Sequence, residues 1–185
     1  MLIQVDRMYA PVTTLGYGRR FGIWTIGCPR HCKNCSNPEL QTPNPAKAID
    51  VKSILRIVSQ YADSIDGITI TGGDPLMQPD ALRELLIGFE AMGIRDVLVY
   101  TGYTMAEINL SSKLSDLLPH IGVLIDGPYI DDLNDNKSIR GSSNQKIWLL
   151  RDELSDRYLN AEQWERKTQV INSNNSLYAI GIPKK

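Results

Sequence analysis

The cysteines of this chain form one compact group. Cys28, Cys32 and Cys35 are the only three in 185 residues, and they lie within an eight-residue stretch between an apolar run and a proline-rich loop. A Cys-x3-Cys-x2-Cys loop can hold one iron–sulfur cluster through three thiolates. A four-iron cluster with three protein ligands keeps one iron open. The spacing therefore indicates a metal centre at which a substrate or cofactor could bind.

An alternative is a closed, structural zinc site made by the three thiolates and His31. His31 is adjacent to Cys32, so its ring would have to fold back toward a metal that its neighbour already binds, and no second Cys or His pair follows. A disulfide is disfavoured, because the cysteine count is odd and no other cysteine is available for pairing. The free thiols favour a reducing compartment.

Composition narrows the class of protein. A chain of 185 residues can form one well-buried core with a small appendage, but not two full domains. The net charge is −1 and the isoelectric point is near 6.1, so the overall field gives no electrostatic case for binding nucleic acid or an acidic membrane. No run approaches the roughly 18 apolar residues of a membrane-spanning helix, and the first residues do not resemble a signal peptide. We expect a cytoplasmic protein.

Segments with strand and helix character alternate between residues 20 and 126. Short β-branched or aromatic runs predict strands, and apolar residues at helical spacing after a capping residue predict helices. The expected strands are 20–27, 65–71, 96–100 and 121–126. Helices are expected to begin at Asp50, at Asp80 with a stop at Gly93, and at Thr104, which forms a capping box with Glu107. This alternation predicts an α/β fold with a parallel sheet.

The loops that leave the predicted strands are rich in functional residue types. They are 28–35, 71–75, 101–103 and 126–129. Because ligands bind outside the carboxyl ends of parallel strands, we expect the four loops to form one shared site.

The last part of the chain differs from the rest. We expect residues 1–150 to form the catalytic core and 151–185 to form a C-terminal extension packed on it. The extension contains two strand-like runs, 167–172 and 177–182, separated by the turn-forming residues 173–176. This pattern predicts a small C-terminal strand hairpin.

A second motif, Thr71-Gly72-Gly73-Asp74-Pro75, follows the predicted strand 65–71. Adjacent glycines allow a ligand to approach the backbone closely and allow φ values that other residues avoid. The alternative is a tight turn in which Asp74 serves as a local cap.

Together these motifs resemble the radical S-adenosylmethionine (radical SAM) superfamily. A narrower match is to the activating enzymes of anaerobic ribonucleotide reductase, over about three quarters of the chain. It rests on an ordered series of segments: 71–76 (TGGDPL), 100–103 (YTGY), 124–130 (LIDGPYI) and 140–145 (RGSSNQ). The resemblance implies an open, partial (β/α) barrel. Residues 151–185 extend past the usual end of that family.

The resemblance also implies roles for individual residues. Cys28, Cys32 and Cys35 would bind a [4Fe-4S] cluster. The methionine end of S-adenosylmethionine would be held by Gly72, Gly73 and Asp74. The nucleoside, or a nearby cation, would be contacted by Thr101, Gly102 and Asp126. The carboxylate or ribose of the cofactor would suit Arg140, Ser142, Ser143 and Asn144. The alternative for this last group is a polar loop that holds the final strand.

The implied reaction is the reductive cleavage of S-adenosylmethionine to a 5′-deoxyadenosyl radical, which generates a glycyl radical on a partner enzyme, here anaerobic ribonucleotide reductase. A basic rim around the cluster would suit a flavodoxin-like electron donor. Its residues would be Arg19, Arg20, Arg30 and Lys33. Two alternatives remain open: a radical SAM enzyme that modifies a ribosomal peptide or small molecule, and a zinc-binding interaction module without catalysis.

Overall fold

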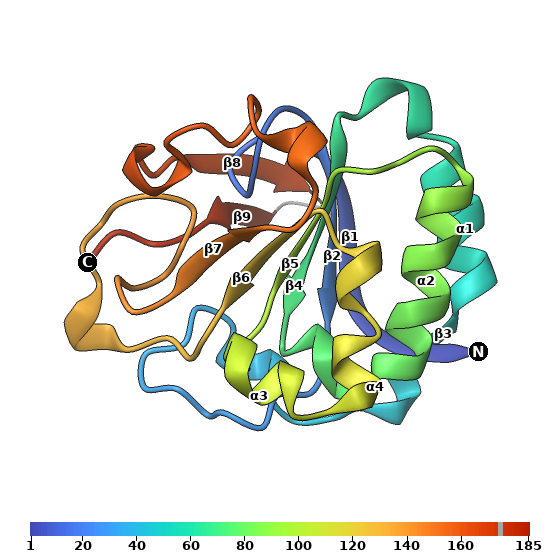
Figure 1. Ribbon diagram of the computed structural model, residues 1–185, viewed down its shortest axis with the longest axis horizontal. Helices are drawn as coiled ribbons and strands as arrows, with labels where there is room; N and C mark the ends of the chain where they lie inside the picture. Colours follow the sequence, from blue (N-terminus) through green and yellow to red (C-terminus); the bar gives the residue numbers. More distant parts are fainter. Residues whose placement is uncertain (174–175) are drawn as a thin grey trace.

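The computed structural model describes residues 1–173 and 176–185 and shows a mixed α/β fold (Figure 1). A seven-stranded sheet has the order β3-β1-β2-β4-β5-β6-β7, and β8 and β9 form a separate hairpin. The sheet strands are β1 (Leu2–Val12), β2 (Arg20–Thr25), β3 (Ala48–Asp50), β4 (Gly67–Gly72), β5 (Val97–Tyr100), β6 (Val123–Asp126) and β7 (Lys146–Leu149). The hairpin strands are β8 (Thr168–Ser173) and β9 (Ser176–Gly181).

The centre of the sheet is parallel, as the sequence predicted. β2, β4, β5 and β6 run in one direction, whereas β1 and β7 pair antiparallel with β2 and β6. The predicted C-terminal hairpin is confirmed by the antiparallel pairing of β8 and β9. Its expected turn includes Asn174 and Asn175, which lie outside the described residues. The carboxyl ends of the four parallel strands consequently share one edge.

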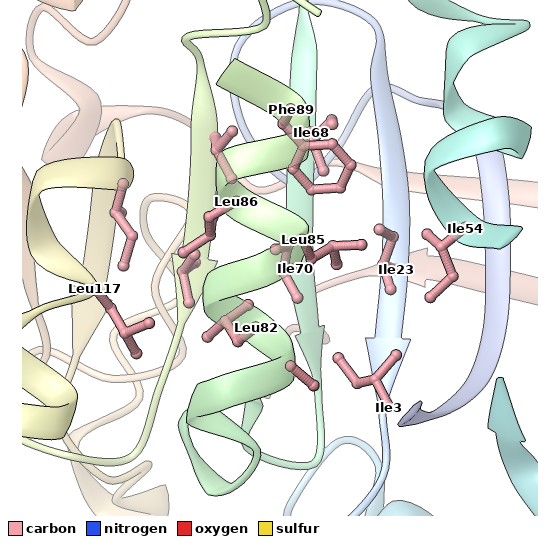
Figure 2. Packing of buried hydrophobic residues seen from close by; sticks show 14 of the residues in the cluster. Ile3, Ile23, Ile54, Ile68, Ile70, Leu82, Leu85, Leu86, Phe89 and Leu117 are labelled. Carbon is pink, nitrogen blue, oxygen red and sulfur yellow. The ribbon is translucent and has the colours of Figure 1, made fainter. Parts of the chain in front are cut away.

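Helices cover one face of this sheet. They are α1 (Val51–Ser59), α2 (Pro79–Ala91), α3 (Met105–Asn109) and α4 (Ser112–Ser115). Figure 2 shows Ile54 of α1 and Leu82, Leu85, Leu86 and Phe89 of α2 packed around Ile23, Ile68 and Ile70 of the sheet. Within the described residues, none of the helices has the length and apolarity that crossing a bilayer requires.

Three of the predicted helix ends are confirmed, whereas α2 begins at Pro79, one residue before the predicted Asp80. Asp50 caps α1 by accepting a bond from the backbone N–H of Lys52 (3.2 Å). Thr104 and Glu107 form the reciprocal capping box of α3. Gly93 follows α2 with φ of 77°, a conformation that suits glycine at the end of a helix.

The opposite face of the sheet carries the alternate residues of the same strands. Leu98, Val123 and Ile125 point away from α1 and α2 and pack against Leu154 and Tyr158. Since side chains alternate across a strand, each strand contributes to both layers. Figure 1 shows the C-terminal segment and its hairpin on this side of the sheet.

The amino edge of the parallel strands is closed by a buried ion pair. Arg20 Nη2 lies 3.0 Å from Asp96 Oδ1, and both side chains are almost completely buried. Arg20 also donates to Thr69 Oγ1 (2.6 Å), and the Tyr158 hydroxyl donates to Asp96 Oδ1 (2.8 Å). The guanidinium and the carboxylate are therefore satisfied by protein groups.

This position overturns part of the predicted basic rim. Arg19 and Arg20 stand at the start of β2, whereas the cysteine loop follows its end. Six extended residues span about 20 Å. Both arginines are thus far from the cysteine loop, although they are near it in sequence.

Candidate functional site

The four predicted loops meet at the carboxyl edge of the sheet. They line one cavity of about 910 Å³ together with part of the C-terminal hairpin. Seven of the predicted site residues line it: Cys28, Cys32, Cys35, Gly72, Gly73, Thr101 and Gly102. The loop that follows β6 contributes Gly127 and Tyr129, so all four loops share the cavity.

The cysteine loop begins directly after β2 and presents three free thiols. All three are half-buried. The loop turns through left-handed backbone conformations at His31 and Asn34, with φ of 46° and 57°. It is held to the proline-rich loop by the bond from Cys28 N–H to Gln41 O (2.9 Å). This conformation directs the three thiols to a common cavity.

The chemistry of these donors fits an iron–sulfur cluster. Burial raises the pKa of the Cys28 and Cys32 thiols, so both are protonated at neutral pH until a metal takes the place of the proton. His31 Nδ1 lies 3.1 Å from Gln41 Oε1, and His31 does not line the cavity. Across residues 1–173 and 176–185, no three His, Cys, Asp or Glu side chains converge as a site for a single metal ion.

Gly72 and Gly73 bring the turn after β4 against the end of β2. Gly72 has φ of 111°, and a Cβ atom at either glycine would collide with the backbone of Thr25 or Gly27. The Gly73 N–H donates to Thr25 O at 2.8 Å, and the Asp74 N–H donates to Gly27 O at 2.6 Å. The glycine pair thus allows close packing and leaves bare backbone on the cavity wall.

Asp74 is completely buried behind that wall. Its carboxylate accepts hydrogen bonds from Thr101 Oγ1 (2.9 Å), Gly102 N–H (2.9 Å) and Leu76 N–H (3.0 Å). Burial raises its pKa to about 6, and the hydrogen bonds oppose the shift. Asp74 therefore acts as a local cap, which was the alternative interpretation of this motif. It also fixes Thr101 and Gly102 relative to the glycine pair.

Arg30 ties the cysteine loop to the segment that follows β5. Its Nη2 donates to Glu107 Oε2 at 2.6 Å, and its guanidinium lies over the Tyr103 ring at 5.0 Å. The hydrogen bond with Arg30 is the largest of the effects that lower the pKa of Glu107 to about 2. The sequence predicted Arg30 in a basic rim and Glu107 in a helix cap. Their pairing has no local signal, because the two residues are 77 positions apart.

Comparison with known proteins agrees with this geometry. Residues 14–148 match a family described as a 4Fe-4S single cluster domain. An anaerobic ribonucleoside-triphosphate reductase-activating protein of Escherichia coli K12 is 35% identical over 153 residues, covering 77% of this chain and 97% of that protein. A protein of the same name from phage T4 is 30% identical over 147 residues, covering 77% and 92%.

The chain belongs to the family of anaerobic ribonucleoside-triphosphate reductase-activating proteins. The resemblance predicted from the motifs is thereby confirmed. Among solved structures, QueE from E. coli is similar to this chain with a TM-score of 0.49 and 18% identity, covering 56% of this chain and 54% of QueE.

Other residues that the family resemblance implied lie behind the cavity wall. Asp126 is buried, and its carboxylate accepts hydrogen bonds from Met105 N–H (2.6 Å) and Lys146 N–H (3.2 Å). It joins the start of α3 to β7 and does not line the cavity. Its neighbour Gly127 does.

In the loop 140–145, too, some residues line the cavity and others do not. Arg140 pairs with Asp135 (3.3 Å), and Ser142 Oγ accepts from Ile130 N–H (3.1 Å). Ser143 is exposed, and its N–H donates to a backbone carbonyl. These three side chains and Asn144 do not line the cavity, whereas their neighbours Gly141 and Gln145 do.

Asn144 nevertheless has an unused polar atom. Its Nδ2 donates to Pro128 O at 2.8 Å. Its Oδ1 is buried without a hydrogen-bond partner among the residues that the structure describes. The contacts of the loop are those of a polar loop that holds β7, and Asn144 keeps one free acceptor.

Several cavity residues were not predicted. Trp24 and Tyr100 line the cavity from the sheet face opposite α1 and α2, and Ile171, Tyr178 and Ile180 line it from the hairpin. The alternation within β2 and β5 was a signal for the first two. Nothing in the local sequence of the hairpin indicates that it reaches the site, because its contacts lie more than 150 residues away.

Proposed function

We propose that this protein is a radical SAM activating enzyme that generates a glycyl radical on anaerobic ribonucleotide reductase. The observation that carries the proposal is the shared cavity at the carboxyl edge, where the thiols of Cys28, Cys32 and Cys35 face the backbone of Gly72 and Gly73. Family membership supports the same reaction. The sheet of four parallel strands would serve as an open, partial (β/α) barrel of the radical SAM type.

The three thiolates would hold a [4Fe-4S] cluster and leave a coordination position free for S-adenosylmethionine. A reduced cluster at these thiolates would supply the one electron that cleaves the cofactor to methionine and a 5′-deoxyadenosyl radical, and that radical would take a hydrogen atom from a glycine Cα of the partner, giving 5′-deoxyadenosine. The residues of this chain orient the cofactor and exclude water.

Each loop would have its own part in this orientation. Gly72 and Gly73 offer backbone polar groups to the methionine end of the cofactor. Thr101 and Gly102, which Asp74 holds in place, lie on the wall beside them and would contact the nucleoside.

We also propose a flavodoxin-like electron donor. Of the four basic residues considered, Arg30 and Lys33 lie within the cysteine loop, and Lys33 is exposed. An acidic surface of the donor would be steered to this side of the cluster. The half-buried free thiols are compatible with a reducing compartment, and we expect the enzyme to act in the cytoplasm.

The test has two steps. The chain is first loaded with iron and sulfide without oxygen, reduced with dithionite and mixed with S-adenosylmethionine. We expect the broad visible absorption of an iron–sulfur cluster and release of 5′-deoxyadenosine, and a Cys32→Ser variant should give neither. If the protein is colourless, binds zinc and does not cleave the cofactor, the proposal that it is an enzyme is refuted.

The second step adds an anaerobic ribonucleotide reductase and records electron paramagnetic resonance. We expect a glycine-centred doublet on the partner. If the cofactor is cleaved but no candidate glycyl-radical partner acquires the doublet, the reaction is instead modification of a peptide or a small molecule.

A further inference from the structure

The C-terminal hairpin forms one wall of the cavity that contains the three cysteines. In the hairpin, Gln169 stands opposite Ile180, and Ile171 stands opposite Tyr178. The side that faces the protein contributes Ile171, Tyr178 and Ile180 to the cavity lining. The hairpin lies beyond residues 14–148, so the cluster-domain family does not include this wall.

One side of the hairpin is anchored near the end of β1. Gln169 Nε2 donates to Pro11 O at 2.9 Å, and Gln169 Oε1 accepts from Thr13 N–H at 3.1 Å. Thr14 Oγ1 donates to Ile180 O at 3.0 Å. Ile180 is only 7% exposed and belongs to the apolar cluster that includes Trp24.

Arg166 anchors the other side. It is buried just before β8, and it donates to Pro183 O (2.9 Å) after β9. It also donates to Arg140 O (2.6 Å) and Gly141 O (2.9 Å), and Gly141 lines the cavity. Because β1 and the loop after β6 lie on different sides of the parallel strands, the hairpin bridges the cavity from one side to the other.

The two faces of the hairpin differ in their surroundings. Directly opposite residues on an antiparallel pair share a face, so Ile171 and Tyr178 lie on the same side as Gln169 and Ile180. Val170 lies on the other face, is 65% exposed and does not line the cavity, although Ala179 opposite it does. Tyr178 lines the cavity and remains 48% exposed. Val170 and Ile171 are thus neighbours of similar chemistry, one outside the cavity and one lining it.

We propose that the inward face of the hairpin, formed by Ile171, Tyr178 and Ile180, is a specificity determinant of the reaction. It is the apolar wall beside which the glycine-bearing segment of the partner lies while its hydrogen atom is removed. The inference rests on the proposed function, which requires such a segment to reach the cavity with the cysteines. It assigns a role in catalysis to the C-terminal extension.

The chemistry of the wall defines what it accepts. None of the three side chains is charged, whereas the charged residues that line the cavity, Arg30 and Lys47 among them, belong to other segments. A charged group placed against the hairpin wall would lose hydration without gaining a partner on that wall. The cavity of about 910 Å³ is near the upper end of the roughly 300–1,000 Å³ found for small-molecule sites. The wall would therefore suit an uncharged, extended segment with small side chains.

The experiment compares Ile171→Ala and Tyr178→Ala with the matched control Val170→Ala in the cluster-loaded enzyme. The measured quantities are KM for the partner and the yield of glycyl radical per 5′-deoxyadenosine released. Both cavity variants should raise KM about tenfold, the equivalent of ~1.4 kcal/mol, and lower the yield. Val170→Ala should match wild type in both quantities.

A second readout does not depend on activity. In a Trp148→Phe/Trp164→Phe background, Trp24 is the only tryptophan left, and it lines the cavity. Ile171→Ala should make Trp24 more accessible to quenching by acrylamide, and Val170→Ala should not. Equal quenching, or equal KM and yield for the cavity and control variants, would overturn the inference. Failure of the wild-type enzyme itself to produce a glycyl radical would instead refute the proposed function.

Discussion

The two edges of the parallel sheet bury polar groups in opposite ways. At the amino edge, Arg20 and Asp96 satisfy each other and are further bonded by Thr69 and Tyr158. At the carboxyl edge, three thiols and the backbone of a glycine pair face an open cavity. The same strands therefore end in a saturated network on one side and in available ligands on the other.

The molecule thus places its stabilising contacts and its reactive groups at different edges of the sheet. Buried polar groups cost free energy unless they are paired, so the amino edge is stable because its pairing is complete. The carboxyl edge leaves groups available, which is where parallel α/β sheets bind ligands. Substitutions at the two edges should accordingly affect different measurements.

The largest expected effect is at the carboxyl edge. Replacing any cysteine, for example Cys32→Ser, should reduce cofactor cleavage to the detection limit, because the cluster loses one of its three ligands. The unfolding free energy of the metal-free chain should change by less than about 1 kcal/mol in urea titrations, because the thiol is only half-buried. If the variant still cleaved the cofactor, the cysteines would not be ligands that the reaction requires.

The next effect is at the amino edge. Asp96→Asn leaves the buried charge of Arg20 without its partner and should cost about 3 kcal/mol or more in unfolding free energy. The exposed Asp63→Asn is the control, with an expected change below about 0.5 kcal/mol. Cleavage per folded molecule should be unchanged. If the Asp96 variant were as stable as the control, the amino edge would not be the stabilising network described above.

Asp74 allows a pH test of the wall behind the cavity. The folded protein keeps the proton of Asp74 up to about pH 6, whereas the unfolded chain releases it near the ordinary pKa of 3.8. The contribution of Asp74 to stability is therefore greatest below pH 3.8 and falls by up to about 3 kcal/mol as the pH rises to 6. Urea unfolding of wild type and Asp74→Asn between pH 4 and 7 should show the difference declining with pH. A constant or increasing difference would contradict this protonation.

The smallest expected change in stability concerns Tyr158, through which the C-terminal extension contacts the ion pair at the amino edge. Tyr158→Phe removes one hydrogen bond to the Asp96 carboxylate and should cost ~1.5 kcal/mol. Tyr61→Phe, at a more exposed position, should stay within about 0.5 kcal/mol of wild type. Equal thermal stability of the two variants would show that the extension adds nothing to the ion pair.

Local patterns in the sequence were sufficient to predict the central elements. β2, β4, β5 and β6 and the ends of α1, α2 and α3 follow from apolar spacing and capping residues, which act over a few positions. β1 was missed because Asp6 and Arg7 interrupt its apolar residues. The cysteine loop was also identified from spacing alone, because its three cysteines are close together in the sequence.

Features that depend on distant contacts could not be predicted. The bonds of Arg20 to Asp96 and of Arg30 to Glu107 each join residues more than 70 positions apart. The hairpin reaches the cavity through contacts with Thr13 and Thr14, which follow β1. Each of these depends on the assembled fold, so no local pattern carries it.

The proposal that three cysteines leave one iron of the cluster open for S-adenosylmethionine can be tested directly by Mössbauer spectroscopy. The chain is loaded with ⁵⁷Fe, and Mössbauer spectra are recorded before and after addition of S-adenosylmethionine. If Cys28, Cys32 and Cys35 hold three irons and the cofactor binds the fourth, one iron of the cluster should change its isomer shift while the others stay the same. A spectrum that the cofactor leaves unchanged, or one that shows no four-iron cluster, would contradict the central claim.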